Sequence, residues 1–132
     1  MELRFRELAE TIDDMIWMSD AETGELLYIS PAMERISGYT PEQVMANREL
    51  YIALIHPDDR EYVLQNAPTA RVGHYDIVYR LVRPDGKIRY LRSRANPVYD
   101  SRGKAMRIAG LTSDITSQRQ LEEQLLQAGK ME

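Results

Sequence analysis

The sequence contains no cysteine. This absence excludes disulfide bonds, thiolate metal sites and a cysteine nucleophile, and with them any cysteinyl adduct with a cofactor. Histidine is almost as scarce, with only His56 and His74, and no metal-ligand spacing appears. A chain without cysteine fits the reducing cytoplasm, which is the location that we expect.

Long apolar runs are also missing. No stretch approaches the roughly 20 residues that a membrane span requires, and no signal-type apolar region follows Met1. We therefore expect no membrane segment in this chain, and any anchor of a parent protein would lie outside it. The net charge is −4, so the overall field does not favour nucleic acid as a partner.

Signatures of catalysis are absent as well. The sequence has no phosphate-binding loop, no dinucleotide fingerprint and no Gly-x-Ser-x-Gly motif. Asp13-Asp14 and Asp58-Asp59 are adjacent carboxylates, but neighbouring residues in turns point apart, so they fit helix and turn caps better than an acid/base pair. We expect that this chain is not an enzyme.

The 132 residues fit one domain, which begins with a short amphipathic segment. Phe5, Leu8, Ala9 and Ile12 follow helical spacing and predict a helix over residues 1–12. A helix this short needs a surface to pack on. Two interpretations stay open: docking onto its own domain, or contact with a second copy of the chain.

A β-hairpin is predicted next, with strands at 15–19 and 26–29 around a glycine-containing loop. If Ile16 and Met18 face the core, alternation places Trp17 on the outer face of the sheet. An exposed tryptophan there would be covered by the N-terminal helix or by a partner chain.

Several short helices are predicted between residues 30 and 70. Ser30-Pro31 offers an N-cap and a first helical proline, with Gly38 as the stop. Thr40 and Gln43 form a capping box. A third helix is expected to open at His56-Pro57, with His56 bonded to backbone at the helix entrance, and to end near Pro68.

A three-stranded antiparallel meander follows. Residues 75–81 alternate with a period of two, 83–87 form a Pro-Asp-Gly turn, and two more strands are predicted at 88–99 and 106–113. Pro97 favours a bend or an edge position. Strands interrupted by helices predict an α+β domain, with one five-stranded antiparallel sheet and short helices on one face.

The last segment, residues 117–132, is predicted to be helical. Ser117 and Gln120 have capping-box spacing. Leu121, Leu125 and Ala128 then step by four and three, which is the start of a coiled-coil seam.

Positive charge gathers on the predicted meander, in Arg80, Arg83, Lys87, Arg89, Arg92, Arg94, Arg102, Lys104 and Arg107. Two interpretations are a solvated outer face paired with carboxylates such as Asp76, and a nucleic-acid surface. Single-strand binders interleave aromatic side chains with such charges, and only Tyr90 qualifies. The first interpretation is favoured, and we expect no nucleic-acid partner.

Several short motifs, weak one by one, are specific in their order. Together they resemble the PAS fold with its C-terminal PAC segment, from about Leu8 to Thr116, with the sensory domain itself at 13–116. The motifs are Ser30-Pro31-Ala32, Gly38-Tyr39-Thr40-Pro41-Glu42, Ile55-His56-Pro57-Asp58-Asp59-Arg60, Tyr79-Arg80-Leu81-Val82-Arg83-Pro84-Asp85-Gly86, and Gly110 through Asp114-Ile115-Thr116.

The tail from Leu121 to Glu132 is similar to the helix that joins a PAS domain to the dimerisation and phosphoacceptor domain of bacterial-type sensor histidine kinases. This resemblance implies a two-component system, a homodimer, and a kinase domain downstream in the same polypeptide. The phosphoacceptor histidine of that family would lie beyond residue 132. Gly129 departs from the helix formers usual there.

The resemblance leaves the cofactor unknown. Haem-binding PAS domains usually carry their iron ligand inside the third predicted helix, which has no histidine here, and this argues against haem. Photoadduct-forming flavin is excluded because the chain has no cysteine. A flavin held without a covalent bond remains open.

The interior is expected either to hold a small ligand or simply to fill the core. The candidate pocket residues are Met18, Met33, Ile36, Val44, Leu54, Leu64, Tyr75, Tyr79, Leu91 and Ser93. Tyrosine hydroxyls buried near Ser93 would need hydrogen-bond partners, which a ligand or water would supply.

Taken as a PAS domain, the chain is expected to sense a small ligand or partner and to signal through its C-terminal helix to a histidine kinase. Asp114 or Thr116 would anchor that helix, and Ile115 would pin it to the sheet. The alternatives are a ligand-free homodimerisation or protein-interaction module, and an input domain for another effector such as a cyclic-di-nucleotide enzyme. Candidate dimer contacts are Phe5, Leu8, Ile12, Trp17, Leu121 and Leu125.

Overall fold

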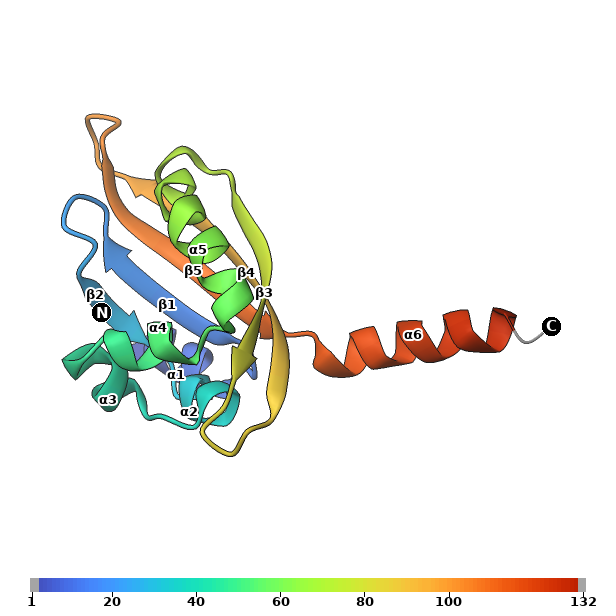
Figure 1. The fold of residues 1–132 in the computed structure, drawn as a ribbon. Helices are drawn as coiled ribbons and strands as arrows, with labels where there is room; N and C mark the ends of the chain where they lie inside the picture. The colour runs from blue at the N-terminus through green and yellow to red at the C-terminus, as the bar shows by residue number, and fades with distance from the viewer. Residues whose placement is uncertain (1–2, 131–132) are drawn as a thin grey trace.

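The computed structural model describes residues 3–130 (Figure 1). In chain order its elements are α1 (Leu3–Thr11), β1 (Met15–Asp20), β2 (Leu26–Ile29), α2 (Ala32–Ser37), α3 (Pro41–Ala46), α4 (Glu49–Leu54), α5 (Pro57–Asn66), the 3₁₀ helix η1 (Ala67–Val72), β3 (Tyr75–Val82), β4 (Ile88–Tyr99), β5 (Ala105–Asp114) and α6 (Thr116–Lys130). The outermost residues of the two predicted flanking segments lie outside the described residues.

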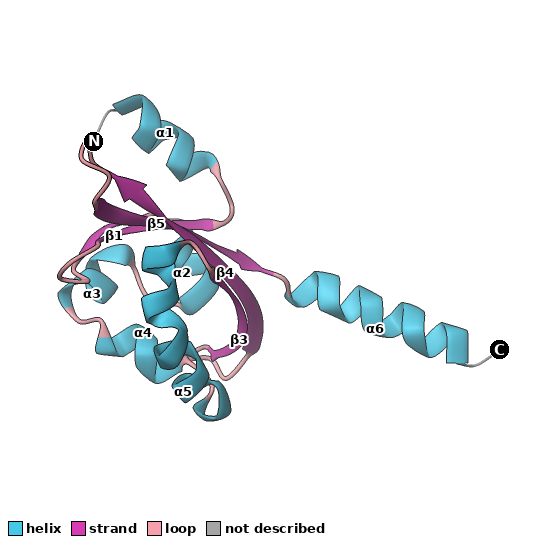
Figure 2. Ribbon diagram, turned by 90° about the horizontal axis from the view of Figure 1, so that it is seen from above, coloured by secondary structure: helices cyan, strands magenta, loops and turns pink. Residues whose placement is uncertain are grey.

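The five strands form one antiparallel sheet in the order β2-β1-β5-β4-β3. The first and last strands of the domain, β1 and β5, are therefore neighbours in the middle of the sheet. Helices α2 to α5 cover one face, α1 lies over the opposite face, and α6 projects away from the body (Figure 2). The predicted α+β architecture with a five-stranded sheet is confirmed.

Local capping signals set the start of α3 and the end of α2. Thr40 Oγ1 accepts a hydrogen bond from the Gln43 N–H and Gln43 Oε1 accepts one from the Thr40 N–H, so the predicted capping box is present. Gly38 ends α2 with a φ of 88°, which a residue with a Cβ rarely adopts. Both signals are local in sequence and are therefore readable without the fold.

The prediction that Ser30 caps α2 is wrong. The helix begins at Ala32 after Pro31, and no side chain caps it. Ser30 Oγ instead accepts a hydrogen bond from the Ile16 N–H at 2.9 Å, and the Ser30 N–H donates to the Ile16 carbonyl at 2.8 Å. Ser30 is fully buried, so its hydroxyl satisfies a buried backbone donor between β1 and β2.

The entrance of α5 is tied to β3. His56 Nδ1 accepts a hydrogen bond from the Asp58 N–H, as expected for a helix entrance. Asp59 accepts three further bonds from Arg80 of β3: from Nε at 2.9 Å, from Nη2 at 2.8 Å and from the backbone N–H at 2.8 Å. This bidentate, charge-assisted pair joins the helical layer to the sheet.

Acid is expected to weaken that joint. Hydrogen bonding from the Arg80 side chain is the main cause that lowers the pKa of Asp59, against a smaller opposing effect of burial. A carboxyl with a lowered folded pKa stabilises the fold above its unfolded pKa of about 4, and this contribution is lost as pH falls through the folded pKa. Asp59→Asn is expected to lower the free energy of unfolding at pH 7 by about 2 kcal/mol and to flatten its decline below about pH 4.

Urea unfolding between pH 2.5 and 7 measures both effects. Asp58→Asn is the matched control, because the neighbouring Asp58 side chain is 78% exposed. If the free energy of unfolding fell as steeply with decreasing pH in Asp59→Asn as in the native chain, the Asp59–Arg80 pair would not be the source of the acid sensitivity.

The meander has the predicted order and turns. Between Ile88 and Ala95, β4 pairs with β3, whereas its end, including Pro97, pairs only with β5. Pro97 therefore has no strand on the β3 side, which is the edge position that its missing N–H favours.

Many basic residues of the meander have carboxylate partners. The pairs are Arg80–Asp59 at 2.8 Å, Arg89–Asp114 at 2.7 Å, Arg92–Asp76 at 2.7 Å and Lys104–Glu22 at 2.6 Å. The Arg92–Asp76 pair is the outer-face pairing that the sequence indicated. This arrangement favours a solvated, internally compensated face.

The flanking helices differ in their attachment. In α1, Ala9 is buried and the Phe5 ring packs edge-on against Tyr28, with centroids 6.3 Å apart, so this helix docks on its own sheet. In α6, the helix begins at Thr116. The prediction that Ser117 is its N-cap is therefore wrong, because the anchoring carboxylate lies before the helix, at Asp114.

Candidate functional site: an internal cavity linked to the exit helix

A cavity of about 580 Å³ lies between the inner face of the sheet and the short helices. Its floor comes from β1, β4 and β5, one wall from β3, and its roof from residues of α2 to α5 and η1. The volume is within the range of small-molecule sites in proteins. Most of the lining side chains are apolar, and the polar ones fall into two groups, hydroxyls in the interior and charges at one end.

Trp17 is the largest side chain of the floor. The prediction that it faces outward is wrong: Met15, Trp17 and Ser19 line the cavity, whereas Met18 pairs with Tyr28 on the outer face. Every residue of Met15–Met18 is apolar, so the alternation of apolar and polar residues could not show which side chains of β1 face the core. That choice depends on Gly110 of β5, which lies directly opposite Trp17 and leaves room for its indole.

Four hydroxyls and the Trp17 indole form one hydrogen-bonded chain across the cavity. Trp17 Nε1 donates to Thr112 Oγ1 at 3.1 Å, and Thr112 Oγ1 lies 2.7 Å from Ser93 Oγ. Ser93 Oγ lies 3.2 Å from the Tyr79 hydroxyl, which lies 2.6 Å from the Tyr51 hydroxyl. The Tyr79 hydroxyl, which the sequence analysis expected to need partners near Ser93, therefore has two hydrogen-bond neighbours, Ser93 and Tyr51.

The tyrosines of the cavity are held in their neutral form. Burial is the main cause that raises the pKa of Tyr51, Tyr75 and Tyr79 above the ordinary tyrosine value. Their hydroxyls therefore keep their protons at neutral pH and act as hydrogen-bond donors as well as acceptors.

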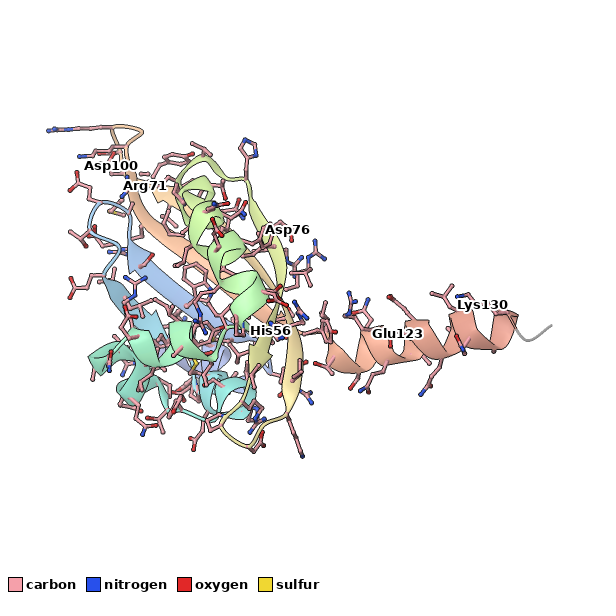
Figure 3. The ribbon with its side chains drawn as sticks, in the orientation of Figure 1. His56, Arg71, Asp76, Asp100, Glu123 and Lys130 are labelled. Atoms are coloured by element: carbon pink, nitrogen blue, oxygen red, sulfur yellow. The ribbon has the colours of Figure 1, made fainter. Side chains whose placement is uncertain are left out.

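The charged lining residues lie at one end, beside the β1–β2 turn. Arg48 Nη1 donates to the Gly24 carbonyl at 2.9 Å, and Arg71 Nη2 donates to the Glu22 carbonyl at 2.9 Å. Asp20 accepts bonds from backbone N–H groups of the same turn, chiefly that of Thr23, and these lower its pKa. Arg71 lies at this end of the domain in Figure 3. Two arginines thus reach across to the turn and bridge one end of the cavity.

The structure brings part of the predicted pocket together. Met33, Val44, Leu64, Tyr75, Tyr79 and Ser93 line the cavity. Met18, Ile36, Leu54 and Leu91 do not. Leu91 and Ile36 are buried in the core, Leu54 packs against it, and Met18 lies on the outer face of the sheet.

Other lining residues were missed, chiefly Trp17, Tyr51, Ile55 and Thr112. Thr112 was detectable, because strict alternation along β5 places it on the face of Gly110. Tyr51 was not, since it lies on the short helix α4, whose N-cap residue Arg48 makes no capping side-chain bond and is not a typical helix start.

At the end of β5 the chain passes into α6 through a dense polar junction. Asp114 Oδ1 accepts hydrogen bonds from Thr116 N–H at 2.9 Å and from Thr116 Oγ1 at 2.6 Å, and Arg89 Nε donates to Asp114 Oδ2 at 2.7 Å. Burial alone would raise the pKa of Asp114, but these bonds outweigh it and lower that pKa.

Backbone bonds to β4 complete the junction. The Ile115 N–H donates to the Tyr90 carbonyl, and the Tyr90 N–H donates to Thr116 Oγ1, both at 2.8 Å. One turn into α6, the Arg119 guanidinium lies 4.4 Å from the centre of the Tyr90 ring. The start of α6 is therefore held on the sheet by Asp114, Ile115 and Thr116.

Beyond that first turn, α6 is free of the domain. Leu121, Leu125 and Leu126 are more than half exposed, and Glu123 and Lys130 extend from the projecting helix (Figure 3). Of the other predicted dimer contacts, Leu8 is 61% exposed and Phe5 37%, Ile12 is half-buried, and Trp17 is inside the cavity.

Residues 3–130 hold no group of three or more histidine, cysteine, aspartate or glutamate side chains placed to bind a metal ion. None of the helices in this range is long and apolar enough to cross a membrane.

A five-stranded antiparallel sheet that encloses a cavity with short helices, and then continues into an exit helix, defines a sensory domain of the PAS type. The model of the PAS fold family matches residues 26–112, and the chain belongs to this family. The resemblance inferred from the motifs is confirmed.

Relatives from several signalling proteins match the chain. A methyl sulfide methyltransferase-associated sensor of Methanosarcina acetivorans is 31% identical over 71% of the chain. The sensor protein FixL of Bradyrhizobium diazoefficiens is 28% identical over 89%, and a probable diguanylate cyclase of Escherichia coli, DgcE, is 29% identical over 66%. The chain spans between 8% and 23% of the length of these three relatives.

Solved structures agree with the family. A sensory box histidine kinase/response regulator from Burkholderia thailandensis aligns over 97% of this chain and 96% of that one, with 27% identity and a TM-score of 0.66. A domain of a putative light and redox sensing histidine kinase from Haloarcula marismortui covers 87% of this chain and all of that one, with 30% identity and a TM-score of 0.66. PAS sensory domains of this kind occur in histidine kinases and diguanylate cyclases.

Proposed function

We propose that this PAS domain is the input module of a sensor histidine kinase, that a small molecule bound in its cavity is the signal, and that α6 carries the signal to the kinase. In this proposal the domain itself catalyses nothing. It converts occupancy of the cavity into a change in how α6 is held, and it acts in the cytoplasm as a homodimer.

One observation carries the proposal: a single strand connects the cavity to the exit helix. Thr112 of β5 lines the cavity, and Asp114, two residues later, bonds the first residue of α6. Side chains two residues apart on a strand lie on the same face. A ligand that moves Thr112 therefore also moves Asp114, because extended backbone joins the two residues. The ligand would in this way shift the equilibrium between two packings of α6 against the sheet.

The histidine kinase is favoured as the output because α6 resembles the helix that leads into the dimerisation domain of such kinases, and because several relatives are sensor kinases. The exposed face of Leu121 and Leu125 fits a parallel partner helix, since the two leucines start an a/d seam. Dimerisation through this face would extend into the next domain of the polypeptide.

A diguanylate cyclase output is the second candidate, favoured by the match to DgcE. The same projecting helix would serve it. A ligand-free dimerisation or interaction module is less favoured, because the domain has a mostly apolar cavity of about 580 Å³, which is within the range of small-molecule sites.

The cavity does not favour haem. Neither His56 nor His74 lines it, so the chain offers no imidazole to an iron atom there. A flavin bound without a covalent bond is compatible with the volume, and the sequence has no cysteine for a photoadduct.

Native mass spectrometry of the purified chain tests the sensing role. A mass in excess of the polypeptide is expected under native conditions and is expected to vanish on denaturation. Ser93→Leu, which fills the centre of the floor with a larger apolar side chain, is expected to abolish the excess mass. A dimer with no excess mass, from cells grown under several conditions, would instead support the ligand-free module.

A further inference from the structure

We propose that the cavity selects an uncharged, planar ring system that stacks on Trp17 and carries a hydrogen-bond acceptor at its edge. This inference rests on the proposed sensing role and names the chemical class of the ligand. Three features of the cavity support it: the orientation of the Trp17 indole, the proton count of the hydroxyl chain, and the location of the charges.

The Trp17 indole lies flat on the sheet. A Cβ added at Gly110 would lie 2.1, 2.2 and 2.6 Å from Trp17 Cε2, Cζ2 and Cδ2, so the face of the ring, rather than its edge, covers the Gly110 backbone. Because Trp17 also lines the cavity, its opposite face is directed away from the sheet into the open volume. A flat aromatic surface of this kind favours offset stacking of another flat ring.

Tyr75 adds a wall at right angles to this floor. Trp17, Gly110, Ala95 and Tyr75 occupy consecutive strands in one row across the sheet. The two residues in the middle are the smallest available, so the rings at the ends meet above them, with centroids 6.4 Å apart and planes at 86°. A ring stacked on Trp17 would therefore present its edge to the face or rim of Tyr75, which is a favoured aromatic geometry.

The hydroxyl chain has one proton more than it can use internally. Tyr51, Tyr79, Ser93 and Thr112 each carry one O–H, and only three hydrogen bonds connect the four oxygens in line. The Trp17 N–H donates into the end of the chain and takes up no hydroxyl proton. Whichever way the three bonds run, one of the four O–H groups has no acceptor among the other three hydroxyls.

All four hydroxyl residues line the cavity, so a ligand held there lies beside the hydroxyls and can accept the remaining proton. A buried donor without a partner is costly, whereas an oxygen with a spare lone pair is tolerated more easily. The cavity therefore favours a ligand that carries an acceptor, such as a carbonyl or ring nitrogen, within reach of one of these four hydroxyls.

Charge is confined to one end of the site. Asp20, Arg48 and Arg71 are the charged lining residues, all at the β1–β2 turn. The two arginines are bonded to carbonyls of that turn, neither of them bonds to Trp17 or to the four hydroxyls among the described residues, and a buried unpaired charge is strongly disfavoured. The ring that occupies this part of the cavity is consequently neutral.

A matched set of three probes tests the class: 1-indanone, which is planar and carries one carbonyl; indane, which keeps the flat aromatic ring but has no acceptor; and octahydroinden-1-one, which keeps the carbonyl but is saturated. The chain has a single tryptophan, so its one indole N–H resonance reports directly on the floor. We expect 1-indanone to bind about tenfold more tightly than indane and about fivefold more tightly than octahydroinden-1-one, and to shift this resonance upfield.

Trp17→Leu is expected to remove the preference for the planar ketone over the saturated one while retaining the preference for a carbonyl, as measured by calorimetric titration. Met18→Leu is the control, because Met18 is the next residue on β1 but lies on the outer face. If Trp17→Leu does not fold, the ranking of the three probes on the native chain still decides the question.

Equal affinity for all three probes, or no binding of 1-indanone up to its solubility limit, would overturn the ligand class. The sensing role has a separate readout. A retained mass in native spectrometry that proves to be an anion or a saturated molecule would leave the sensing role intact and overturn only the assignment of a neutral planar ring. Absence of any retained mass would count against the sensing role itself.

Discussion

Replacing Gly110 with alanine is expected to lower the free energy of unfolding by about 3 kcal/mol, which would be one of the largest effects of any single methyl group added to this domain. The added Cβ would lie 2.1 Å from Trp17 Cε2, well inside van der Waals contact. Gly110 is in the middle of β5, between β1 and β4, so its backbone cannot move away without disturbing two strand pairs.

The indole cannot move away easily either. Its N–H is bonded to Thr112 and its ring packs against Tyr75, so displacement would leave a buried donor unpaired and open the aromatic corner. We therefore also expect Gly110→Ala to abolish retention of the ligand. Urea unfolding at pH 7 measures the stability, and native mass spectrometry measures the retention.

Gly129→Ala is the matched control, because it adds the same methyl group where no atom of the described residues beyond its own helix lies within 4 Å. Gly129 is in the exposed part of α6, so alanine there is expected to raise helix stability by about 1 kcal/mol. If Gly110→Ala were as stable as the native chain, the close packing of Trp17 on β5 would be wrong, and the stacking proposal with it.

Asp114→Ala is expected to abolish the response of the downstream kinase to the ligand while leaving the sensory domain folded. The substitution removes the acceptor of two hydrogen bonds from Thr116 and the carboxylate partner of Arg89. The expected loss of stability is about 2 kcal/mol, a fraction of what a domain of this size usually has. The lost hydrogen bonds are those that anchor α6, so the first turn of this helix is expected to fray.

Autophosphorylation of the complete kinase with and without ligand measures the coupling, and circular dichroism of the isolated chain measures folding. Asp76→Ala is the control, since Asp76 also pairs with an arginine, Arg92, but on the outer face of the sheet and away from α6. Unchanged signalling by Asp114→Ala would contradict the proposal that β5 and its junction transmit the signal. A similar loss in Asp76→Ala would show that the effect is not specific to the junction.

Much of the architecture was predictable because its signals are local. The capping box at Thr40, the stop at Gly38 and the Pro-Asp-Gly turn before β4 each depend on residues within one turn of one another. Alternation along β3 placed Tyr75 and Tyr79 on the inner face correctly, since polar residues separate them. Where apolar and polar residues alternate, the phase of a strand is readable.

The site was predictable only in part, because a cavity depends on which surfaces meet. Ser30 was expected to cap a helix, but its hydroxyl satisfies the Ile16 N–H because β1 passes beside it. A capping box was expected at Ser117, but α6 begins one residue earlier and Asp114, which the sequence also offered as an anchor, bonds Thr116 two residues away. At Ser30 a contact distant in sequence replaced a plausible local one, whereas at α6 Arg89 and Tyr90 of the neighbouring strand add distant partners to a local anchor.

The sequence by itself determined the fold class, the order of the elements and the family, since these follow from periodicity, turn chemistry and the order of motifs. Tertiary structure alone decided the face of Trp17. Each residue of Met15–Met18 is apolar, so the strand would bury equally hydrophobic side chains whichever of its two faces turned toward the core. Gly110, more than ninety positions away, provides on one face a flat backbone on which an indole fits. The shape of the cavity therefore depends on that long-range contact, because steric fit between neighbouring strands is set only when the sheet is formed.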